Sequence, residues 1–282
     1  MKGPNVDRDV VAGFGDEWTR FDQDGLKDSE ADQIFQDYFS QFPWDLITAK
    51  SVGADFGCGS GRWAKLVAHR VGRLHCIDAS HAALQVAKRN LAASPNCVFH
   101  CASVEEAPIA PQSLDFGYSL GVLHHTPDPA EALSACARFL KPGAPFLVYL
   151  YYRFDNRPRW FRMIWLCSEF LRSVVSRSPH FVRFVISQVL ATFLYWPLAR
   201  LSQALRAFGK DVSALPLSYY ADKSFYVMRT DALDRFGTRL EHRFTRVEIT
   251  EMMQRAGLER ISFSDSAPFW CAVGYRSRQQ LA

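Results

Sequence analysis

The sequence predicts an α/β fold in which a mostly parallel sheet is flanked by helices. Between residues 52 and 152, short apolar runs alternate with helix-like stretches, and the same rhythm returns after residue 246. Strands that alternate with helices at intervals of about 20 to 30 residues are typical of βαβ units, which build parallel sheets. The two regions are separated by an apolar, aromatic-rich helical stretch, which we interpret as a large insertion after the fifth strand.

Each element is expected from its own pattern. Apolar runs predict strands at 51–56, 74–77, 97–101, 114–120, 145–151, 258–263 and 270–275. Helical spacing predicts helices at 62–70, 82–91, 129–140 and 246–256, and a helical cap around 31–39. The residues between 211 and 245 are rich in turn formers and are expected to form turns and loops.

Length and composition fit one core with an insertion better than two equal domains. A chain of 282 residues, 48% of them hydrophobic, lies near the upper size limit of one compact domain. The pattern divides the chain into an N-terminal helical cap, an α/β core, a helical insertion or lid, and the C-terminal part of the core sheet. These segments are expected at 1–50, 51–153, 154–245 and 246–282.

Charge and cysteine content exclude several classes of protein. The net charge of +4 is small, so the total does not call for nucleic acid or a membrane as a partner. Seven cysteines, an odd number without a CxxC pair, argue against disulfides and against a zinc site, and no metal is expected. Free thiols and a polar N-terminus without a signal-type apolar run predict a cytoplasmic protein.

A glycine-rich turn follows the first predicted strand. Residues 57–61 read Gly-Cys-Gly-Ser-Gly, and a helix is expected to begin at Arg62. A tight strand-to-helix turn requires positive φ angles, and side chains there would block the approach of a ligand to the backbone. The turn therefore predicts a cofactor site at the head of the sheet.

Asp78 ends the next strand, where an acid can accept hydrogen bonds from both ribose hydroxyls. It could instead cap the helix that begins near Ala82, but Ser80 suits that role better. A glycine turn followed by such an acid is also typical of proteins that bind a nicotinamide dinucleotide. Their fingerprint has a third glycine three residues after the second, where this chain has Arg62, so the nicotinamide interpretation is disfavoured.

Four blocks in order carry a resemblance to a known family. They are 54–61 (Ala-Asp-Phe-Gly-Cys-Gly-Ser-Gly), Asp78, 115–125 (Asp-Phe-Gly-Tyr-Ser-Leu-Gly-Val-Leu-His-His) and 140–143 (Leu-Lys-Pro-Gly). Together they resemble the class I S-adenosylmethionine (SAM)-dependent methyltransferases, particularly the branch acting on small molecules and lipid-like quinones. The resemblance covers roughly 50–153 and 246–276, and it implies a Rossmann-like sheet of seven strands.

The resemblance also implies which residues hold SAM and its product S-adenosylhomocysteine. These are Asp55, Gly57, Cys58, Gly59, Gly61, Asp78, Ala79, Ser103, Val104, Leu120 and Gly121. Asp55 and the glycine turn would hold the methionine end, Asp78 the ribose, and Leu120 with Gly121 the wall beside the sulfonium. Many relatives have an acid at the adenine amino group; here the aligned residue is Ser103, so adenine recognition is expected to use Ser103 and the Val104 backbone.

Candidate catalytic residues follow the fourth and fifth strands. A sulfonium methyl is already activated, so the enzyme must chiefly align a nucleophile and exclude water, while a base helps with an oxygen or carbon acid. His124, His125 and Tyr152 lie where the strands end, and imidazole suits proton transfer near neutral pH. For the histidines, the alternative is a purely local role in orienting the loop that follows.

Five further residues are candidates for binding the acceptor: Trp18, Asp155, Asn156, Tyr219 and Tyr220. The residues 231–238 are expected to form a polar, aromatic loop that could also line the acceptor pocket. For all of these, the alternative is packing of aromatic rings and polar turns without a ligand.

The predicted insertion concentrates the basic charge of the chain. Residues 156–210 carry nine basic side chains and a single acid, Glu169, a net charge of +8, interleaved with many aromatics. This combination suits peripheral contact with a membrane surface, or a lid over an amphipathic acceptor. The longest charge-free stretch, 184–199, has 16 residues and includes Pro197, so we expect no spanning helix. A structural lid or a homodimer face is the alternative, and nucleic acid is disfavoured as a partner.

These observations predict a SAM-dependent methyltransferase that acts on a small or lipid-linked acceptor such as a quinone, isoprenoid or glycolipid precursor. Two alternatives stay open. One is an enzyme of the same cofactor fold that transfers a group other than methyl. The other is a SAM-binding or membrane-docking module without catalysis.

Overall fold

A computed structural model describes residues 5–278 and divides them into two units. The first unit comprises the residues up to 23, 32–153 and those from 240 onward, and the second comprises 24–31 and 154–239. The first and last residues of the predicted cap and C-terminal segments, 1–4 and 279–282, lie outside the described part.

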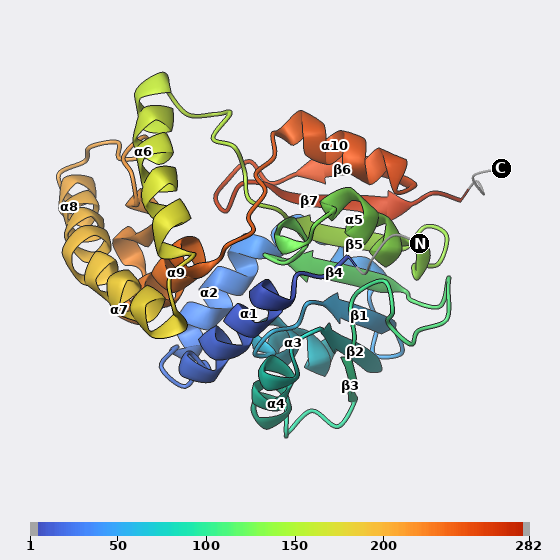
Figure 1. The fold of residues 1–282 in the computed structure, drawn as a ribbon. Helices are drawn as coiled ribbons and strands as arrows, with labels where there is room; N and C mark the ends of the chain where they lie inside the picture. The colour runs from blue at the N-terminus through green and yellow to red at the C-terminus, as the bar shows by residue number, and fades with distance from the viewer. Residues whose placement is uncertain (1–4, 279–282) are drawn as a thin grey trace. The chain divides into compact units, whose positions relative to one another are not determined.

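The first unit is built on a seven-stranded sheet (Figure 1). Its strands are β1 Val52–Phe56, β2 Arg73–Asp78, β3 Cys97–Cys101, β4 Phe116–Leu120, β5 Pro145–Tyr149, β6 Leu258–Phe263 and β7 Cys271–Arg276. Their order is β3-β2-β1-β4-β5-β7-β6, and only β7 runs antiparallel to its neighbours. The predicted Rossmann-like, mostly parallel sheet is therefore confirmed.

Helices cover both faces of this sheet. They are α3 Arg62–Val67, continued by the 3-10 turn Ala68–Arg70, α4 His81–Asn90, α5 Pro129–Arg138 and α10 Arg246–Arg255. Figure 1 shows α5 and α10 on one face and α3 and α4 on the other. Leu133 of α5 and Met253 of α10 pack into one core with Phe56 and Phe146 of the sheet, all fully buried. Burial on both faces explains the continuous apolar runs of the central strands.

The N-terminal segment forms two helices and an aromatic cluster. Helix α1 spans Arg8–Arg20 and helix α2 spans Asp28–Tyr38, and a 3-10 turn follows at Trp44–Leu46. Phe39 packs edge-on against Tyr118, with ring centroids 5.3 Å apart, and Phe42 against Phe116 at 6.0 Å. The aromatics near the N-terminus therefore cover the face of β4 that α5 does not.

The second unit contains the helical insertion after the fifth strand. Its elements are α6 Arg159–Val175, α7 His180–Leu190, the π-helical turn Ala191–Tyr195, α8 Trp196–Ala207, the 3-10 turn Ser218–Asp222 and α9 Phe225–Gly237. Val175, Tyr195, Met228 and Phe236 form its buried core. This unit has a hydrophobic core of its own.

Helix α9 corrects the expectation of turns and loops between 211 and 245. Ser224 caps the helix by accepting a hydrogen bond from the Val227 amide at 3.3 Å. Met228, Ala232 and Phe236 then recur at helical spacing and are buried in the core of the unit. Residues 231–238, expected as a loop, therefore lie largely within a helix, because burial of this apolar stripe outweighs the local turn propensity.

A second correction concerns Pro197. The helix runs without a break from His180 to Ala207, 28 residues, which is long and apolar enough to cross a membrane by length and composition. Pro197 lacks an N–H and would clash with the preceding turn of a regular helix. The widened π-helical turn at Ala191–Tyr195, directly before α8, accommodates it. The continuous helix is therefore longer than the 16-residue charge-free stretch on which the expectation of no spanning helix was based.

Candidate active site

The glycine turn joins β1 to α3 with three residues in left-handed backbone conformation. Gly57, Gly59 and Gly61 have φ angles of +84°, +52° and +78°. A Cβ on Gly57 would stand 2.4 Å from a Val122 methyl, and one on Gly59 would stand 2.8 Å from the Trp18 indole nitrogen. Both the backbone angles and the surrounding side chains therefore require glycine at the turn.

Hydrogen bonds tie this turn to the end of β2. The amides of Gly57 and Cys58 both donate to the Ile77 carbonyl, at 2.8 and 2.9 Å. The Gly59 amide donates to Asp78 Oδ2 at 2.8 Å. The parallel pairing of Phe56 with Ile77 brings the two strand ends level, so the turn and the acid meet at one edge of the sheet.

Asp78 is held by backbone amides on both of its oxygens. Oδ1 accepts from the Ser80 amide at 2.8 Å, while Oδ2 accepts from Gly59. Burial raises the pKa of Asp78, and these two amide bonds oppose the rise. Ser80, as expected, caps α4 by accepting from the Ala83 amide. Each carboxylate oxygen keeps a second acceptor position, which suits the two hydroxyls of a ribose.

Asp55 lies under the turn as a buried acid. Asp55 is 1% exposed, and neither of its carboxylate oxygens has a hydrogen-bond partner among residues 5–278. Burial raises the pKa of Asp55 well above its ordinary value; the neighbouring Tyr118 hydroxyl opposes the rise, and the nearby charge of Asp78 adds to it. A buried acid without a partner is costly unless a cation joins it. The ammonium group at the methionine end of SAM is such a cation, so the residues present fit the cofactor.

The thiol of Cys58 lies in the same turn and is buried. A hydrogen bond with Cys76 lowers its pKa, but burial together with the nearby charges of Asp78 and Asp55 outweighs it and raises the pKa of Cys58 to about 11. The side chain is therefore a neutral thiol near pH 7, and it packs as a small apolar group.

Beyond β4, Leu120 and Gly121 border open space. Gly121 has a φ angle of +77°, and no described atom lies within 4 Å of where its Cβ would stand. Leu120 is 7% exposed and forms the floor beside it. The gap lies at the carboxyl edge of the sheet, where ligands of α/β proteins bind.

Ser103 and Val104 have local partners. The Ser103 hydroxyl donates to the Glu106 carboxylate at 3.2 Å and accepts from the Glu106 amide at 3.3 Å. The Val104 side chain packs into the main hydrophobic core. The Ser103 side chain therefore closes a turn of its own, and the Val104 backbone is the other group at this position that sequence reasoning assigned to adenine.

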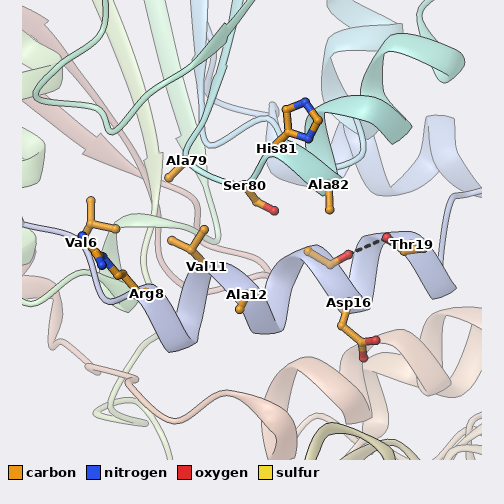
Figure 2. A pocket seen from close by; sticks show the side chains of 11 residues that line it. Val6, Arg8, Val11, Ala12, Asp16, Thr19, Ala79, Ser80, His81 and Ala82 are labelled. Carbon is orange, nitrogen blue, oxygen red and sulfur yellow. Dashed lines mark hydrogen bonds between the residues drawn. The ribbon is translucent and has the colours of Figure 1, made fainter.

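A cavity of about 480 Å³ lies between α1 and the turn that follows Asp78. Figure 2 shows α1 on one side and Ala79 to Ala82 on the other. Its walls are Val6, Arg8, Val11, Ala12, Gly15, Asp16, Thr19, Ala79, Ser80, His81 and Ala82. Ala79, predicted for the cofactor, lines this space, and the N-terminal helix supplies the facing wall.

The two histidines after β4 are buried against Tyr151. The ring of His124 lies 4.0 Å from that of His125 and 3.9 Å from that of Tyr151, between centroids. Burial, with the neighbouring His125 and Arg243, lowers the pKa of His124 well below its ordinary value. His125 Nδ1 lies 2.7 Å from the Leu240 carbonyl. A carbonyl only accepts, so Nδ1 carries the hydrogen and Nε2 carries the lone pair.

Tyr151, which sequence reasoning missed, stands beside the histidines in the position expected of Tyr152. Side chains alternate along an extended chain, so Tyr149 and Tyr151 share one face, with ring centroids 5.7 Å apart. Tyr152 points the other way and packs against Phe269 and Trp270 at 5.6 and 6.3 Å. The alternation from the buried strand was the signal that could have identified Tyr151.

Trp18 lies against the glycine turn, although it was predicted to bind the acceptor. Phe14, one helical turn earlier on α1, packs against His125 with centroids 5.0 Å apart, a contact that no sequence pattern indicated. Helix α1 thus contributes to both the cofactor turn and the histidine cluster.

The remaining predicted acceptor residues belong to the second unit. Asp155 and Asn156 are exposed, and the Asp155 carbonyl accepts from Arg162 at 3.3 Å. The Tyr220 hydroxyl donates to Asp231 at 2.9 Å, and the Lys223 ammonium lies 5.1 Å from the centre of the Tyr219 ring. Within that unit, Tyr220 therefore has a structural partner.

Comparison with known proteins identifies the core. Residues 54–148 match the family described as a methyltransferase domain. These residues form a methyltransferase domain. The match spans β1 through β5 and includes the glycine turn, Asp78 and the histidine pair. Over this segment, the resemblance to class I SAM-dependent methyltransferases is confirmed.

Two curated relatives of the methyltransferase domain are both named ubiquinone biosynthesis O-methyltransferase. The protein from Alkalilimnicola ehrlichii is 33% identical over 128 residues, which cover 45% of this chain and 51% of the relative. The protein from Hahella chejuensis is 31% identical over 144 residues, covering 50% and 59%. The chain therefore spans about half the length of the curated relatives it matches.

Solved structures share the fold. A chain from the complex between the Haloferax volcanii Trm112 methyltransferase activator and a methyltransferase aligns with a TM-score of 0.52 at 15% identity, covering 93% of this chain and 97% of that one. A SAM-dependent methyltransferase from Aquifex aeolicus aligns with a TM-score of 0.50 at 12% identity, covering 93% and 96%. At these identities the likeness establishes the fold alone.

Metal ligands do not gather in the described part of the chain. Among residues 5–278, no three side chains of His, Cys, Asp or Glu come together as a metal site would require.

The buried acid leads to a first prediction, on Asp55→Asn. The raised pKa of Asp55 means that the folded protein binds a proton more tightly than the unfolded chain, so its stability falls as pH rises above the ordinary aspartate value of about 4. The unliganded variant should melt at a higher temperature than wild type at pH 7, with the difference vanishing near pH 4. Its affinity for S-adenosylhomocysteine should fall. Scanning calorimetry measures the melting temperature, and titration calorimetry measures the affinity.

Asp45→Asn, which changes an exposed aspartate, is the matched control and should show neither effect. A variant Asp55→Asn that melts below wild type at pH 7 would contradict the assignment of Asp55 as an uncompensated acid.

Proposed function

We propose that this protein is a SAM-dependent methyltransferase that methylates a hydroxyl group on a small, amphipathic acceptor of the quinone type. One observation carries the proposal: two acids lie at the glycine turn. Asp78 accepts a hydrogen bond from the Gly59 amide at the proposed ribose position, and Asp55 lies beneath the turn with no hydrogen-bond partner among residues 5–278. The curated relatives, both named for ubiquinone biosynthesis O-methylation, support the acceptor class.

The proposed cofactor residues act by binding and orientation. Asp78 accepts the ribose hydroxyls, Asp55 neutralises the ammonium, and Gly57 and Gly59 leave room for the methionine end. Leu120 and Gly121 border the space beside the sulfonium, and Ala79 with the Val104 backbone face the adenosine end. When bound, SAM supplies a methyl group already activated by the positive sulfur, so the chain needs mainly to hold the acceptor in line and exclude water.

The histidine cluster supplies the acceptor side of this proposal. Phe14, His125 and Tyr151 form an aromatic wall that suits a planar ring. His125 has the tautomer in which Nε2 is the basic atom, and we assign to it removal of the proton from the acceptor hydroxyl. His124, neutral because burial lowers its pKa, serves as a polar part of the wall. Tyr152 keeps a supporting role through its packing on Phe269.

Within the second unit, we propose acceptor contacts for four further residues, Asp155, Asn156, Tyr219 and Tyr220. Their polar and aromatic character suits the headgroup and ring of an amphipathic molecule. Once an acceptor is identified, substitution of each of these residues tests its role, with the KM for the acceptor as the measurement.

Methyl transfer is tested with labelled cofactor. Wild-type protein incubated with methyl-labelled SAM and fractionated lipid and aqueous extracts should yield a labelled product in the lipid fractions, detected by mass analysis. Asp78→Ala should bind S-adenosylhomocysteine roughly 100-fold more weakly and transfer no label, because it loses two charge-assisted hydrogen bonds. Thermal melting of the variant checks its fold.

The other outcomes of this assay distinguish the alternatives. Tight binding of S-adenosylhomocysteine without labelled product in any fraction would favour a non-catalytic module. Release of 5′-methylthioadenosine would indicate transfer of a different group. Either result would overturn the proposed reaction.

The role of His125 has its own test. His125→Ala should lower kcat by roughly 100-fold or more, the range for loss of a general base, and leave the affinity for S-adenosylhomocysteine within about twofold of wild type. His69→Ala, which changes an exposed histidine away from the glycine turn, is the control. Unchanged kcat in His125→Ala would remove the residue from the mechanism.

We further propose that residues 156–210 contact an anionic membrane surface, where a quinone-type acceptor would dissolve. Sixteen of the twenty exposed large hydrophobic side chains found among the described residues fall between Trp160 and Phe208. The same segment carries the net charge of +8, which attracts acidic headgroups. Exposed apolar side chains beside basic ones are the features of an interfacial helix.

Peripheral contact fits this helix better than spanning. Arg183 and Arg200 bracket the charge-free stretch 184–199, whose 16 residues reach about 24 Å as a helix, against about 30 Å of hydrocarbon. One face of the same helix, with Ala191, Tyr195 and Ala199, belongs to the core of the second unit. A helix with one face in a protein core and one exposed apolar face lies along a membrane more readily than across it.

Vesicle binding measures this contact. Wild-type protein should sediment with phosphatidylglycerol vesicles more than with phosphatidylcholine vesicles, and less at high salt, because surface charge is screened. Phe181→Ser with Phe193→Ser, at side chains 69% and 76% exposed, should cut binding severalfold. Leu46→Ser, at a side chain 53% exposed in the first unit, should not.

Two results would contradict peripheral contact. Protein that stays with membranes through an alkaline carbonate wash would be an integral protein. The second is a wild-type protein that does not bind vesicles but sediments as a homodimer, when the paired serine variant sediments as a monomer. That result would identify the same face as a subunit interface.

A further inference from the structure

The indole of Trp18 lies against the glycine turn by its N–H edge. Measured to the position that a Cβ on Gly59 would take, the Trp18 atoms Nε1, Cε2 and Cδ1 stand at 2.8, 3.0 and 3.4 Å. The pyrrole edge of the ring, which carries the only polar hydrogen of the side chain, is therefore the part nearest the turn. Among residues 5–278, Trp18 Nε1 makes no hydrogen bond.

The turn has few donors of its own left for an anion. Four of its five amides are already engaged: Gly57 and Cys58 donate to Ile77, Gly59 to Asp78, and Gly61 to Cys58. In many nucleotide sites such amides face the negative group of the ligand. Here they hold the turn to β2 and close it on itself, so the turn offers a carboxylate only the amide and hydroxyl of Ser60, and a donor from another element would add to these.

Helix α1 holds Trp18 in place through contacts along one face. Gly15 packs against the turn after β2, where a Cβ would stand 2.8 Å from Ser80 Oγ and 3.3 Å from the Ala82 methyl. Phe14 packs against His125 after β4. Residues three and four apart share a helix face, so Phe14, Gly15 and Trp18 present one surface to the loops after three strands. Asp7 fixes the start of the helix by accepting from the Asp9 and Val10 amides.

We propose that Trp18 is a cofactor-binding residue whose Nε1–H donates a hydrogen bond to the carboxylate at the amino-acid end of the cofactor. The proposal rests on the proposed function, and it assigns the two charges of that end to different elements. Asp55 beneath the turn meets the ammonium, while Trp18 from the N-terminal helix meets the carboxylate. Trp18 lies outside the matched residues 54–148, so the family pattern does not assign it.

The chemistry of the indole separates this role from simple packing. Indole nitrogen is a donor only, so it selects an acceptor such as a carboxylate. If the tryptophan only covered the site, its substitution would lower the affinity for every adenosyl ligand by the same factor. A tryptophan that binds the carboxylate should affect only ligands that carry one.

Calorimetry with two ligands tests the proposal. S-adenosylhomocysteine carries the amino-acid end, and 5′-methylthioadenosine has the same adenosine and sulfur without it. Trp18→Phe keeps an aromatic ring and removes the N–H, so its affinity for S-adenosylhomocysteine should fall about tenfold, the value of one hydrogen bond to a charged group. Its affinity for 5′-methylthioadenosine should stay within about twofold of wild type.

Trp44→Phe is the matched control. Trp44 packs among Phe35, Phe39 and Phe42. It should leave both affinities at wild-type values. Thermal melting of all three proteins confirms that the variants fold.

The outcomes separate this inference from the function on which it rests. Wild type that binds neither ligand would overturn the cofactor assignment itself. Wild type that binds both, with Trp18→Phe unchanged for S-adenosylhomocysteine, would overturn only the role of Trp18. Equal loss for both ligands would make Trp18 a cover without a carboxylate contact, which also overturns the proposal.

Discussion

The hydrogen bond between the Gly59 amide and the Asp78 carboxylate is the contact on which the site depends. It joins the turn after β1 to the end of β2 at 2.8 Å, and the Ile77 carbonyl reinforces it by accepting two further amides of the turn. The acid is thereby fixed in orientation before any ligand arrives. A preorganised acceptor loses little freedom on binding, so more of its hydrogen-bond energy appears as affinity.

The same arrangement has a cost in stability, and Asp55 carries most of it. An acid that is 1% exposed and has no hydrogen-bond partner raises the free energy of the folded state unless it is protonated or joined by a cation. Function and stability therefore oppose each other at this residue. A ligand that brings a positive charge removes the conflict, and the folded protein gains stability through linkage to ligand binding.

Sequence patterns identified the centre of the sheet because burial on both faces leaves a nearly continuous apolar run in strands such as β4 and β5. Strand β6 appears at the residues expected, 258–263, and helix α10 ends one residue before its predicted limit. The glycine turn and Asp78 were also evident, since positive φ angles restrict the turn to glycine. These features depend on local chemistry, which the sequence records directly.

What the sequence did not reveal depends on contacts between distant residues. Helix α9 was taken for loops because its apolar stripe, Met228, Ala232 and Phe236, gains its stability from α7 and the π-helical turn and not from local propensity. Pro197 was taken to interrupt a helix, but the wider turn before it is a backbone adjustment without a residue signature. Tyr151, one residue before the candidate Tyr152, packs on His124, because neighbouring residues of an extended chain lie on opposite faces.

The two units divide the physical tasks of the chain. In the first, backbone amides hold Asp78 beside the glycine turn, and Asp55 is buried beneath it. In the second, large hydrophobic side chains such as Phe193 and Phe208, 76% and 81% exposed, accompany an excess of basic charge. Exposed rings on this scale lower solubility unless a partner covers them. A surface that covers apolar rings and also attracts basic side chains must be both apolar and acidic, and an anionic lipid layer has both properties. The same segment of a second protein copy would have to supply acidic residues. Residues 156–210 contain only one, Glu169, which already pairs with Arg235.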